Sequence, residues 1–116
     1  MKTENVVQTK SYAFAVRIVR LYQHLVNEKK EFVLSKQVLR CGTSIGANVE
    51  EAIAGISKKD FTAKMSISSK EARETKYWLR LIDKSNIVQI DVSKPLLEIE
   101  SIINILTKIV KTSQEN

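Results

Sequence analysis

The sequence predicts an all-α protein that folds as an up-down-up-down antiparallel four-helix bundle. Between residues 35 and 83, apolar residues recur at steps of three and four in two successive series, which places each series on one face of a helix. The 116 residues include only 3 glycines and 1 proline, a composition that favours long helices over a β-sandwich with many turns. The segments between the helical patterns are short, so consecutive helices run antiparallel. We therefore expect residues 1–116 to form a single helical domain.

The first helix is predicted at about residues 5–27. Two neighbouring apolar stripes follow the helical period there, and the charged run from Glu28 to Glu31 breaks the pattern and begins a loop. Two such stripes exceed what the core of one bundle requires. The first stripe contains Val7, Phe14, Ile18, Leu21 and Leu25, and the second contains Ala15, Val19, Tyr22 and Val26.

The second helix is predicted at about residues 35–54. Ser35 is the expected N-cap, because its hydroxyl can accept a hydrogen bond from the first turn. Gly55 is expected to end the helix, at a position where the backbone is usually left-handed. Gly42 and Gly46 lie within the helix and indicate a notch for close packing rather than a phosphate-binding loop. The apolar series consists of Val38, Gly42, Ile45, Val49, Ala52 and Ile56.

The third helix is predicted at about residues 58–84. Ser57 and Asp60 have the spacing of a capping box, in which the serine side chain bonds a first-turn N–H. Only the turn at residues 55–57 separates this helix from the second, so the two form an antiparallel hairpin. Its apolar series consists of Phe61, Met65, Ser68, Ala72, Thr75, Leu79 and Ile82.

The fourth helix is predicted at about residues 93–113, with Ser93 and Pro95 in its first turn. Between residues 96 and 110, nine of fifteen positions are Leu, Ile or Val, which is wider than one core requires. Contiguous apolar patches are uncommon on the surface of monomers, so we predict a homo-oligomer. The expected subunit interface consists of Ile67, Trp78, Leu81, Ile102, Ile105 and Ile109.

The charge of the chain is positive and uneven. The formal net charge is +6, and residues 57–85 carry eight basic but only four acidic side chains. Placed on a helical wheel, the basic residues of the third helix share about a third of the circumference. Lys and Arg bind phosphates without reading bases, and an aromatic ring can stack on an unpaired base. The predicted nucleic-acid-binding residues are Lys58, Lys59, Lys70, Arg73, Lys76, Tyr77, Arg80 and Lys84; alternatively, the charge only maintains solubility.

Other features of the sequence indicate a cytoplasmic protein. Cys41 is the single cysteine, so an internal disulfide is excluded. The N-terminus lacks the pattern of a signal peptide, and no segment approaches the roughly 20 apolar residues of a membrane span. We expect no membrane partner.

The acidic residues do not form a metal site. Glu50, Glu51, Glu71 and Glu74 lie on facing helices, as carboxylates do in di-iron bundles, but such sites require Glu-x-x-His motifs. The only histidine is His24, outside these helices. We therefore expect no metal, no cofactor, no small-molecule substrate and no catalytic residue.

Arg17 and His24 leave one enzymatic alternative open. Six residues separate them on the first helix, which fits a loose Arg-x-His pattern of some all-helical ribonucleases. Ile18 stands where a polar residue is expected in that pattern. A solvent-exposed His24 is the favoured interpretation.

Three segments resemble the bacterial four-helix-bundle proteins encoded by intervening sequences in 23S rRNA genes. They are LRCGTSIGANVEEA at residues 39–52, DF at residues 60–61 and KEARETKYWL at residues 70–79. The resemblance implies closed rings of bundles, typically pentamers. It also implies a relation to the accessory proteins of diversity-generating retroelements, which bind nucleic acid through basic surfaces.

For this family the biochemical role is not established, and the resemblance implies structural rather than chemical roles for its polar residues. These are expected to order contacts between helices and between subunits. Cys41 and Gly42 depart from the family pattern, which has small or basic residues there. The polar residues that match the family are Arg40, Asn48, Glu51, Glu71 and Glu74.

Three functional hypotheses follow. The first is a non-enzymatic, ring-forming bundle that binds structured RNA, or an RNA–protein assembly, through the basic face of the third helix. The second is a protein-binding scaffold without nucleic-acid binding. The third is a ribonuclease that uses Arg17 and His24.

Overall fold

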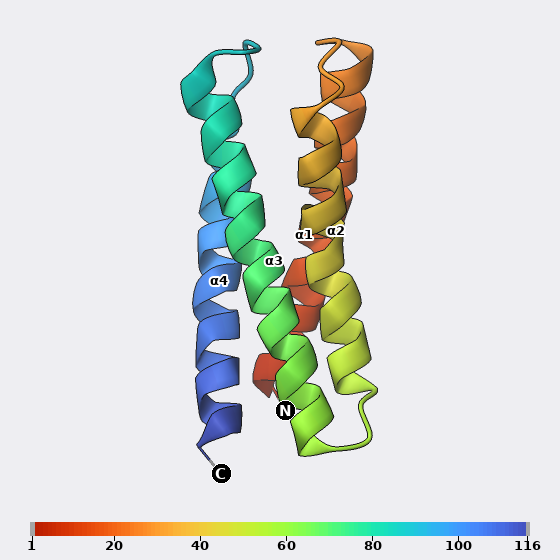
Figure 1. The fold of residues 1–116 in the computed structure, drawn as a ribbon, viewed down its shortest axis with the longest axis vertical. Coiled ribbons are helices and arrows are strands. Elements are labelled where there is room, and N and C mark those ends of the chain that lie inside the picture. Colours follow the sequence, from red (N-terminus) through yellow and green to blue (C-terminus); the bar gives the residue numbers. More distant parts are fainter. Residues whose placement is uncertain (1, 116) are drawn as a thin grey trace.

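Four helices make up the computed structural model, which describes residues 2–115, with side chains from residue 6 onward. They are α1 (Lys2–Asn27), α2 (Leu34–Ile53), α3 (Lys58–Ser85) and α4 (Ser93–Gln114). Consecutive helices run antiparallel, and α4 packs back against α1, which gives a rod of 46 × 21 × 20 Å (Figure 1). The described residues contain no strand. The prediction of an all-α, up-down-up-down bundle is confirmed.

The start of α2 is capped by a residue that precedes it in the loop. The Glu31 carboxylate accepts hydrogen bonds from the backbone N–H groups of Val33 and Leu34, each at 3.0 Å, and of Ser35 at 2.7 Å. Ser35 lies inside the first turn, and its hydroxyl donates to the Glu31 carbonyl oxygen at 2.8 Å. The prediction of Ser35 as N-cap is wrong, because a carboxylate reaches three unpaired N–H groups where a hydroxyl reaches one.

These hydrogen bonds also lower the pKa of the Glu31 carboxyl. Glu31 is only 7% exposed. Burial acts to raise the pKa of its carboxyl, but the backbone N–H donors outweigh burial and hold the pKa below its ordinary value of 4.5. The ionised form is therefore the one that stabilises the start of α2.

The turn between α2 and α3 contains one confirmed and one corrected prediction. The Ser57 side chain accepts a hydrogen bond from the Asp60 backbone N–H at 3.0 Å, as the capping box predicts. Gly55 does not have a positive φ, so the expected left-handed end of α2 is wrong. A Cβ atom at Gly55 would lie 2.6 Å from Asp60 Oδ2 and 3.0 Å from the Ala52 carbonyl oxygen. Close approach of these two oxygen atoms, and not the backbone conformation, disfavours a side chain at Gly55.

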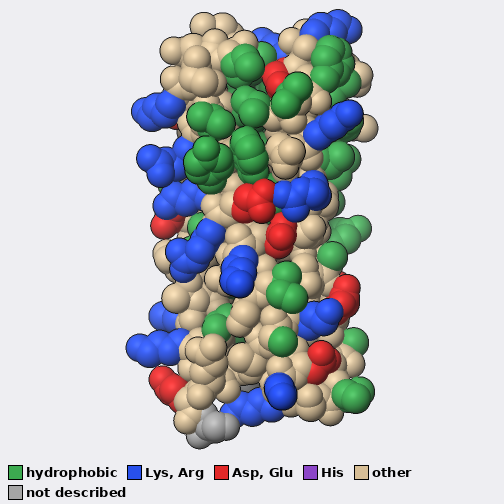
Figure 2. Space-filling model, in the orientation of Figure 1, with side chains coloured by type: hydrophobic (Ala, Val, Ile, Leu, Met, Phe, Trp, Pro, Cys, Tyr) green, Lys and Arg blue, Asp and Glu red, His purple; other side chains and the backbone are tan. Residues whose placement is uncertain are grey.

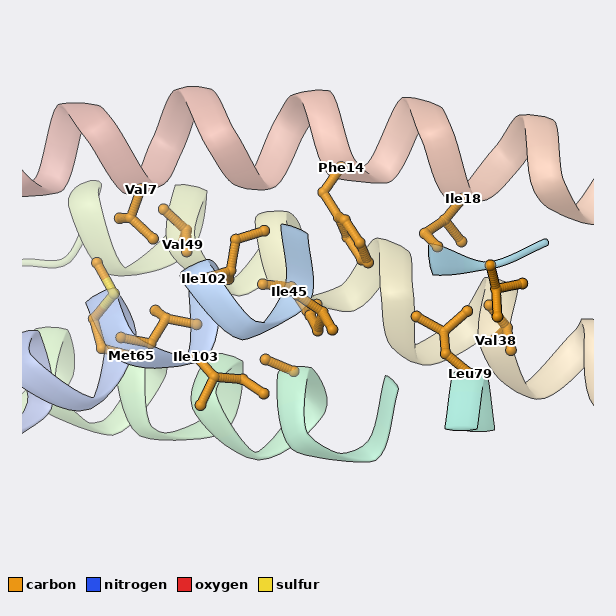
Figure 3. Packing of buried hydrophobic residues seen from close by; sticks show 14 of the residues in the cluster. Val7, Phe14, Ile18, Val38, Ile45, Val49, Met65, Leu79, Ile102 and Ile103 are labelled. Atoms are coloured by element: carbon orange, nitrogen blue, oxygen red, sulfur yellow. The ribbon is translucent and has the colours of Figure 1, made fainter. Parts of the chain in front are cut away.

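The core lies along the axis of the bundle and draws on every helix (Figure 3). The apolar series predicted for α2 and α3 is buried with two exceptions: Phe61 is half-buried, and Ile56 is 99% exposed. Ile56 follows Gly55 and is no longer helical, so the heptad spacing has no meaning there. The side chains labelled in Figure 3 come from all four helices and point toward one another: Val7, Phe14, Ile18, Val38, Ile45, Val49, Met65, Leu79, Ile102 and Ile103.

Helix α4 uses its wide apolar face mainly within the same chain. Ile102 is 1% and Ile109 7% exposed, and both belong to the core. Neither has the free surface that a subunit interface needs, so their prediction as interface residues is corrected. A bundle helix packs against two neighbours, here α1 and α3, which doubles the width of its buried stripe. Ile105 remains half-buried, and Leu97 is 74% exposed.

Helices α1 and α2 approach closely at the predicted glycine notch. A Cβ atom at Gly42 would lie 2.9 Å from Ile18 Cγ2 and 3.0 Å from Ile18 Cγ1. At Gly46 a Cβ atom would be 3.4 Å from the Ser11 carbonyl oxygen, an ordinary van der Waals contact. The notch is therefore tight at Gly42 and open enough for a methyl group at Gly46.

Candidate nucleic-acid interface

The basic residues of α3 lie on the side of the helix that faces α4 and solvent. Arg73, Arg80 and Lys84 are exposed, and Lys76 is half-buried. Two of these residues contact α4: Arg73 Nη2 donates to Thr107 Oγ1 at 3.0 Å, and Lys76 Nζ lies 2.7 Å from Glu100 Oε2. Figure 2 shows Lys and Arg side chains along the edge that α3 and α4 form on the left of the view. Lys58, Lys59, Lys70 and Tyr77 are exposed along the same helix.

The sequence analysis missed one basic residue of this surface. Lys111 of α4 is exposed and follows Glu100 and Thr107 at the helical spacing that places all three on one face. Because Glu100 and Thr107 contact α3, Lys111 belongs to the same edge of the bundle. The spacing of residues 100, 107 and 111 was visible in the sequence, but their pairing with α3 was not. We name Lys70, Arg73, Lys76, Arg80, Lys84 and Lys111 the α3–α4 basic edge.

The carboxylates of α3 lie on its opposite flank, against α2. Arg40 of α2 forms ion pairs with Glu71, at 3.5 Å, and with Glu74. The indole Nε1 of Trp78 also donates to Glu74 Oε2, at 3.0 Å. This polar cluster of Arg40, Glu71, Glu74 and Trp78 links the two helices. It also holds Glu71 and Glu74 away from the α3–α4 basic edge, whereas Asp83 lies 4.0 Å from Lys84 on that edge.

Glu51 and Asn48, two other polar residues of the family resemblance, make different kinds of contact. Glu51 of α2 pairs with Lys64 of α3 at 2.9 Å, and this hydrogen-bonded pair raises the pKa of Lys64. Asn48 instead donates to the Ser44 carbonyl oxygen at 2.9 Å, within α2. The structure therefore brings Glu51 to α3 but leaves Asn48 on its own helix.

Apolar side chains accompany the polar cluster at the surface. Ile67 is 41% exposed, and Trp78 and Leu81 are half-buried. The Tyr77 and Trp78 rings meet edge to face, with centroids 5.1 Å apart. Figure 2 shows hydrophobic side chains gathered over the upper parts of α2 and α3, above acidic and basic side chains at mid-height. This face retains apolar surface that the bundle core does not use.

Cys41 has a packing role beside the polar cluster. It is fully buried, and its Sγ donates to the Gln37 carbonyl oxygen at 2.9 Å. Burial raises the pKa of the Cys41 thiol, which disfavours the reactive thiolate.

Arg17 and His24 line one hollow between α1 and the start of α4. Arg17 forms an ion pair with Glu98 of α4, and His24 is exposed.

In the part of the chain that the structure describes, no group of three His, Cys, Asp or Glu side chains is arranged to hold a metal ion. No helix among the described residues is both long and apolar enough to cross a membrane.

Comparison with known proteins identifies the family. Residues 3–108 match the family described as 23S rRNA-intervening sequence protein. The chain is also similar to a crystal structure of a protein with unknown function from the S23 ribosomal protein family of Bacteroides thetaiotaomicron VPI-5482. The two are 48% identical with a TM-score of 0.89, over 94% of this chain and 98% of that chain. The curated proteins gave no match. The chain therefore belongs to the 23S rRNA-intervening sequence protein family.

Proposed function

We propose that this protein is a non-enzymatic, ring-forming bundle that binds structured RNA, or an RNA–protein assembly, through the α3–α4 basic edge. One observation carries the proposal: α3 separates its charges, with exposed cations toward α4 and with Glu71 and Glu74 held against α2 by Arg40. Cations scattered for solubility alone have no need of such separation. Glu100 and Asp83 pair with Lys76 and Lys84 on this edge, but the cations outnumber them there. The excess positive charge concentrates potential where a phosphate backbone can approach.

The chemistry of this edge suits recognition of shape rather than sequence. Lys and Arg side chains neutralise phosphates, and this releases counterions from the nucleic acid. Tyr77 is 58% exposed and presents a ring on which an unpaired base can stack. If several copies form a ring, the basic edge is repeated in each subunit. Even when a single edge binds RNA weakly, the combined affinity rises through multivalency.

The proposal predicts a salt-dependent RNA affinity that depends on the basic edge. In titrations with a labelled RNA stem-loop, the triple variant Arg73→Glu, Lys76→Glu and Arg80→Glu should bind at least about 100-fold more weakly than the parent. The slope of log affinity against log salt should also fall, by about one for each phosphate that the variant no longer neutralises.

A charge-matched control separates the edge from net charge. The variant Lys10→Glu, Lys36→Glu and Lys30→Glu changes three exposed lysines outside the edge by the same total charge. It should retain most of the affinity. Equal binding by parent and edge variant, with helicity intact by circular dichroism, would remove the edge from consideration and leave the scaffold hypothesis. RNA cleavage that disappears in His24→Ala would instead support the ribonuclease hypothesis.

Self-association is proposed to use the apolar face beside the polar cluster. Ile67, Trp78 and Leu81 retain apolar surface on this face that a partner can cover. Ile105, the other predicted interface residue, is half-buried on α4 and lies outside this face. Light scattering coupled to size exclusion should give several times the chain mass of 13.2 kDa. Ile67→Lys with Leu81→Lys should give 13.2 kDa, because two charges cannot be buried in an interface without partners.

The matched control places lysines at the ends of the bundle. Ile56 and Ile87 are 99% and 55% exposed, so Ile56→Lys with Ile87→Lys adds the same charge away from the proposed face. This variant should keep the parent's mass. A parent protein that elutes as a monomer at micromolar concentration contradicts the ring.

A further inference from the structure

A hollow of about 620 Å³ lies between the second half of α1, the α3–α4 loop and the first turn of α4. Its volume falls in the range of small-molecule sites, roughly 300–1,000 Å³. Ala13, Leu21 and Pro95 contribute apolar surface to its lining. The basic side chains and the histidine around it come from three separate segments: Arg17, Arg20, His24, Lys29 and Lys94.

The positive charges of this hollow are only partly balanced by the protein. Arg17 is paired with Glu98, and Asp91 adds one negative charge to the lining, but within the described part of the chain no carboxylate pairs with Arg20, Lys29 or Lys94. Like charges brought together in a concavity repel one another, and they lower the energy of an anion placed among them. The arrangement is therefore favourable only when an anion occupies it or solvent screens it.

The acidic residue of the hollow is already engaged by the backbone. Asp91 Oδ1 accepts a hydrogen bond from the Ser93 N–H at 2.9 Å, and this bond lowers the pKa of Asp91. The N-cap Val92 supplies no side-chain hydrogen bond. Pro95 has no N–H, and the Leu96 N–H bonds the Val92 carbonyl oxygen at 3.0 Å. The N–H groups at this end of α4 are therefore largely engaged within the protein, so the basic side chains supply the attraction for an anion.

We propose that this hollow binds a triphosphate group, carried either by a free nucleoside triphosphate or by the 5′ end of an RNA. Three unpaired cations from α1, the following loop and α4 match the several charged oxygens of such a group better than those of a single carboxylate. Gln89 and Ser93 in the lining offer hydrogen-bonding groups for the hydroxyls of a sugar. Apart from the His24 imidazole, the lining has no ring on which a base can stack, so we expect little discrimination between bases. This site is separate from the α3–α4 basic edge, and the proposal does not depend on that edge.

The test uses the full chain and three probes at low salt: inorganic triphosphate, adenosine triphosphate and guanosine triphosphate. Calorimetric titration should show saturable binding of all three, with the two nucleotides equal. Arg20→Gln with Lys94→Gln should weaken binding by about tenfold or more for each cation removed. Lys10→Gln with Lys36→Gln, outside the hollow, should bind like the parent. Absence of saturable binding of every probe, or equal affinity of the hollow variant, overturns the proposal.

A second arm distinguishes the two sources of the triphosphate. In the background of Arg73→Glu, Lys76→Glu and Arg80→Glu, an RNA with a 5′-triphosphate is compared with the same RNA ending in a 5′-hydroxyl. Tighter binding of the triphosphate RNA than of free nucleotide identifies an RNA end, and the reverse order identifies a free nucleotide. Because the basic edge is already reversed, failure here is distinct from failure of the proposed RNA interface.

Discussion

Gly42→Leu should lower the free energy of unfolding by about 3 kcal/mol or more, as expected for overpacking of a tight core. The first added atom alone would stand 2.9 Å from Ile18 Cγ2, and a branched core side chain cannot turn away. Gly46→Ala is the matched control on the same helix. It meets only an ordinary contact at 3.4 Å, so its better helix propensity should stabilise the protein by up to about 1 kcal/mol.

Urea unfolding followed by circular dichroism at one fixed protein concentration measures both effects, because self-association adds a concentration dependence. Combining Gly42→Leu with Ile18→Ala should recover part of the stability, since the second change empties the space that the first one fills. Equal stability of Gly42→Leu and the parent would show that α1 and α2 do not approach closely at this point.

Glu31→Gln should destabilise the protein by about 1–2 kcal/mol at pH 7, the usual cost of removing a helix cap. Three backbone N–H groups bond the Glu31 carboxylate, and a neutral amide satisfies them less well. Because folding lowers the pKa of Glu31, its contribution is complete above the ordinary value of 4.5 and is lost as pH falls through the lower folded pKa.

The stability difference between parent and Glu31→Gln should therefore shrink when the pH is lowered from 7 to 3, as measured by urea unfolding. Glu28→Gln is the control, because Glu28 is exposed in the same loop and its side chain caps no helix. A stability difference that stays constant across this pH range would show that the carboxylate charge does not stabilise α2.

The heptad series of α2 and α3 predicted the core well because burial repeats with the helix itself. Val38, Ile45 and Leu79 are all fully buried, as their spacing requires. The same counting was wrong at Ile56, because the spacing says nothing about where the helix ends. It was wrong at Ile102 and Ile109 for a different reason. The width of an apolar face does not reveal whether a second helix of the same chain or another subunit covers it.

Side-chain partners far apart in sequence were harder to predict. The cap of α2 had a local signal, since Glu31 stands four residues before Ser35, but a serine was the more familiar choice. The hollow at α1 had no such signal. Arg17, Arg20 and His24 share one side of a helix, yet their meeting with Lys94 depends on how α4 returns along α1. Only the tertiary arrangement brings these charges together.

The single cysteine makes the packing of α2 against α3 accessible to kinetic measurement. Cys41 is fully enclosed, and a thiol-specific reagent needs an accessible thiolate. Labelling therefore requires a transient separation of the two helices. The rate of that reaction reports how often this half of the molecule opens, without any engineered probe.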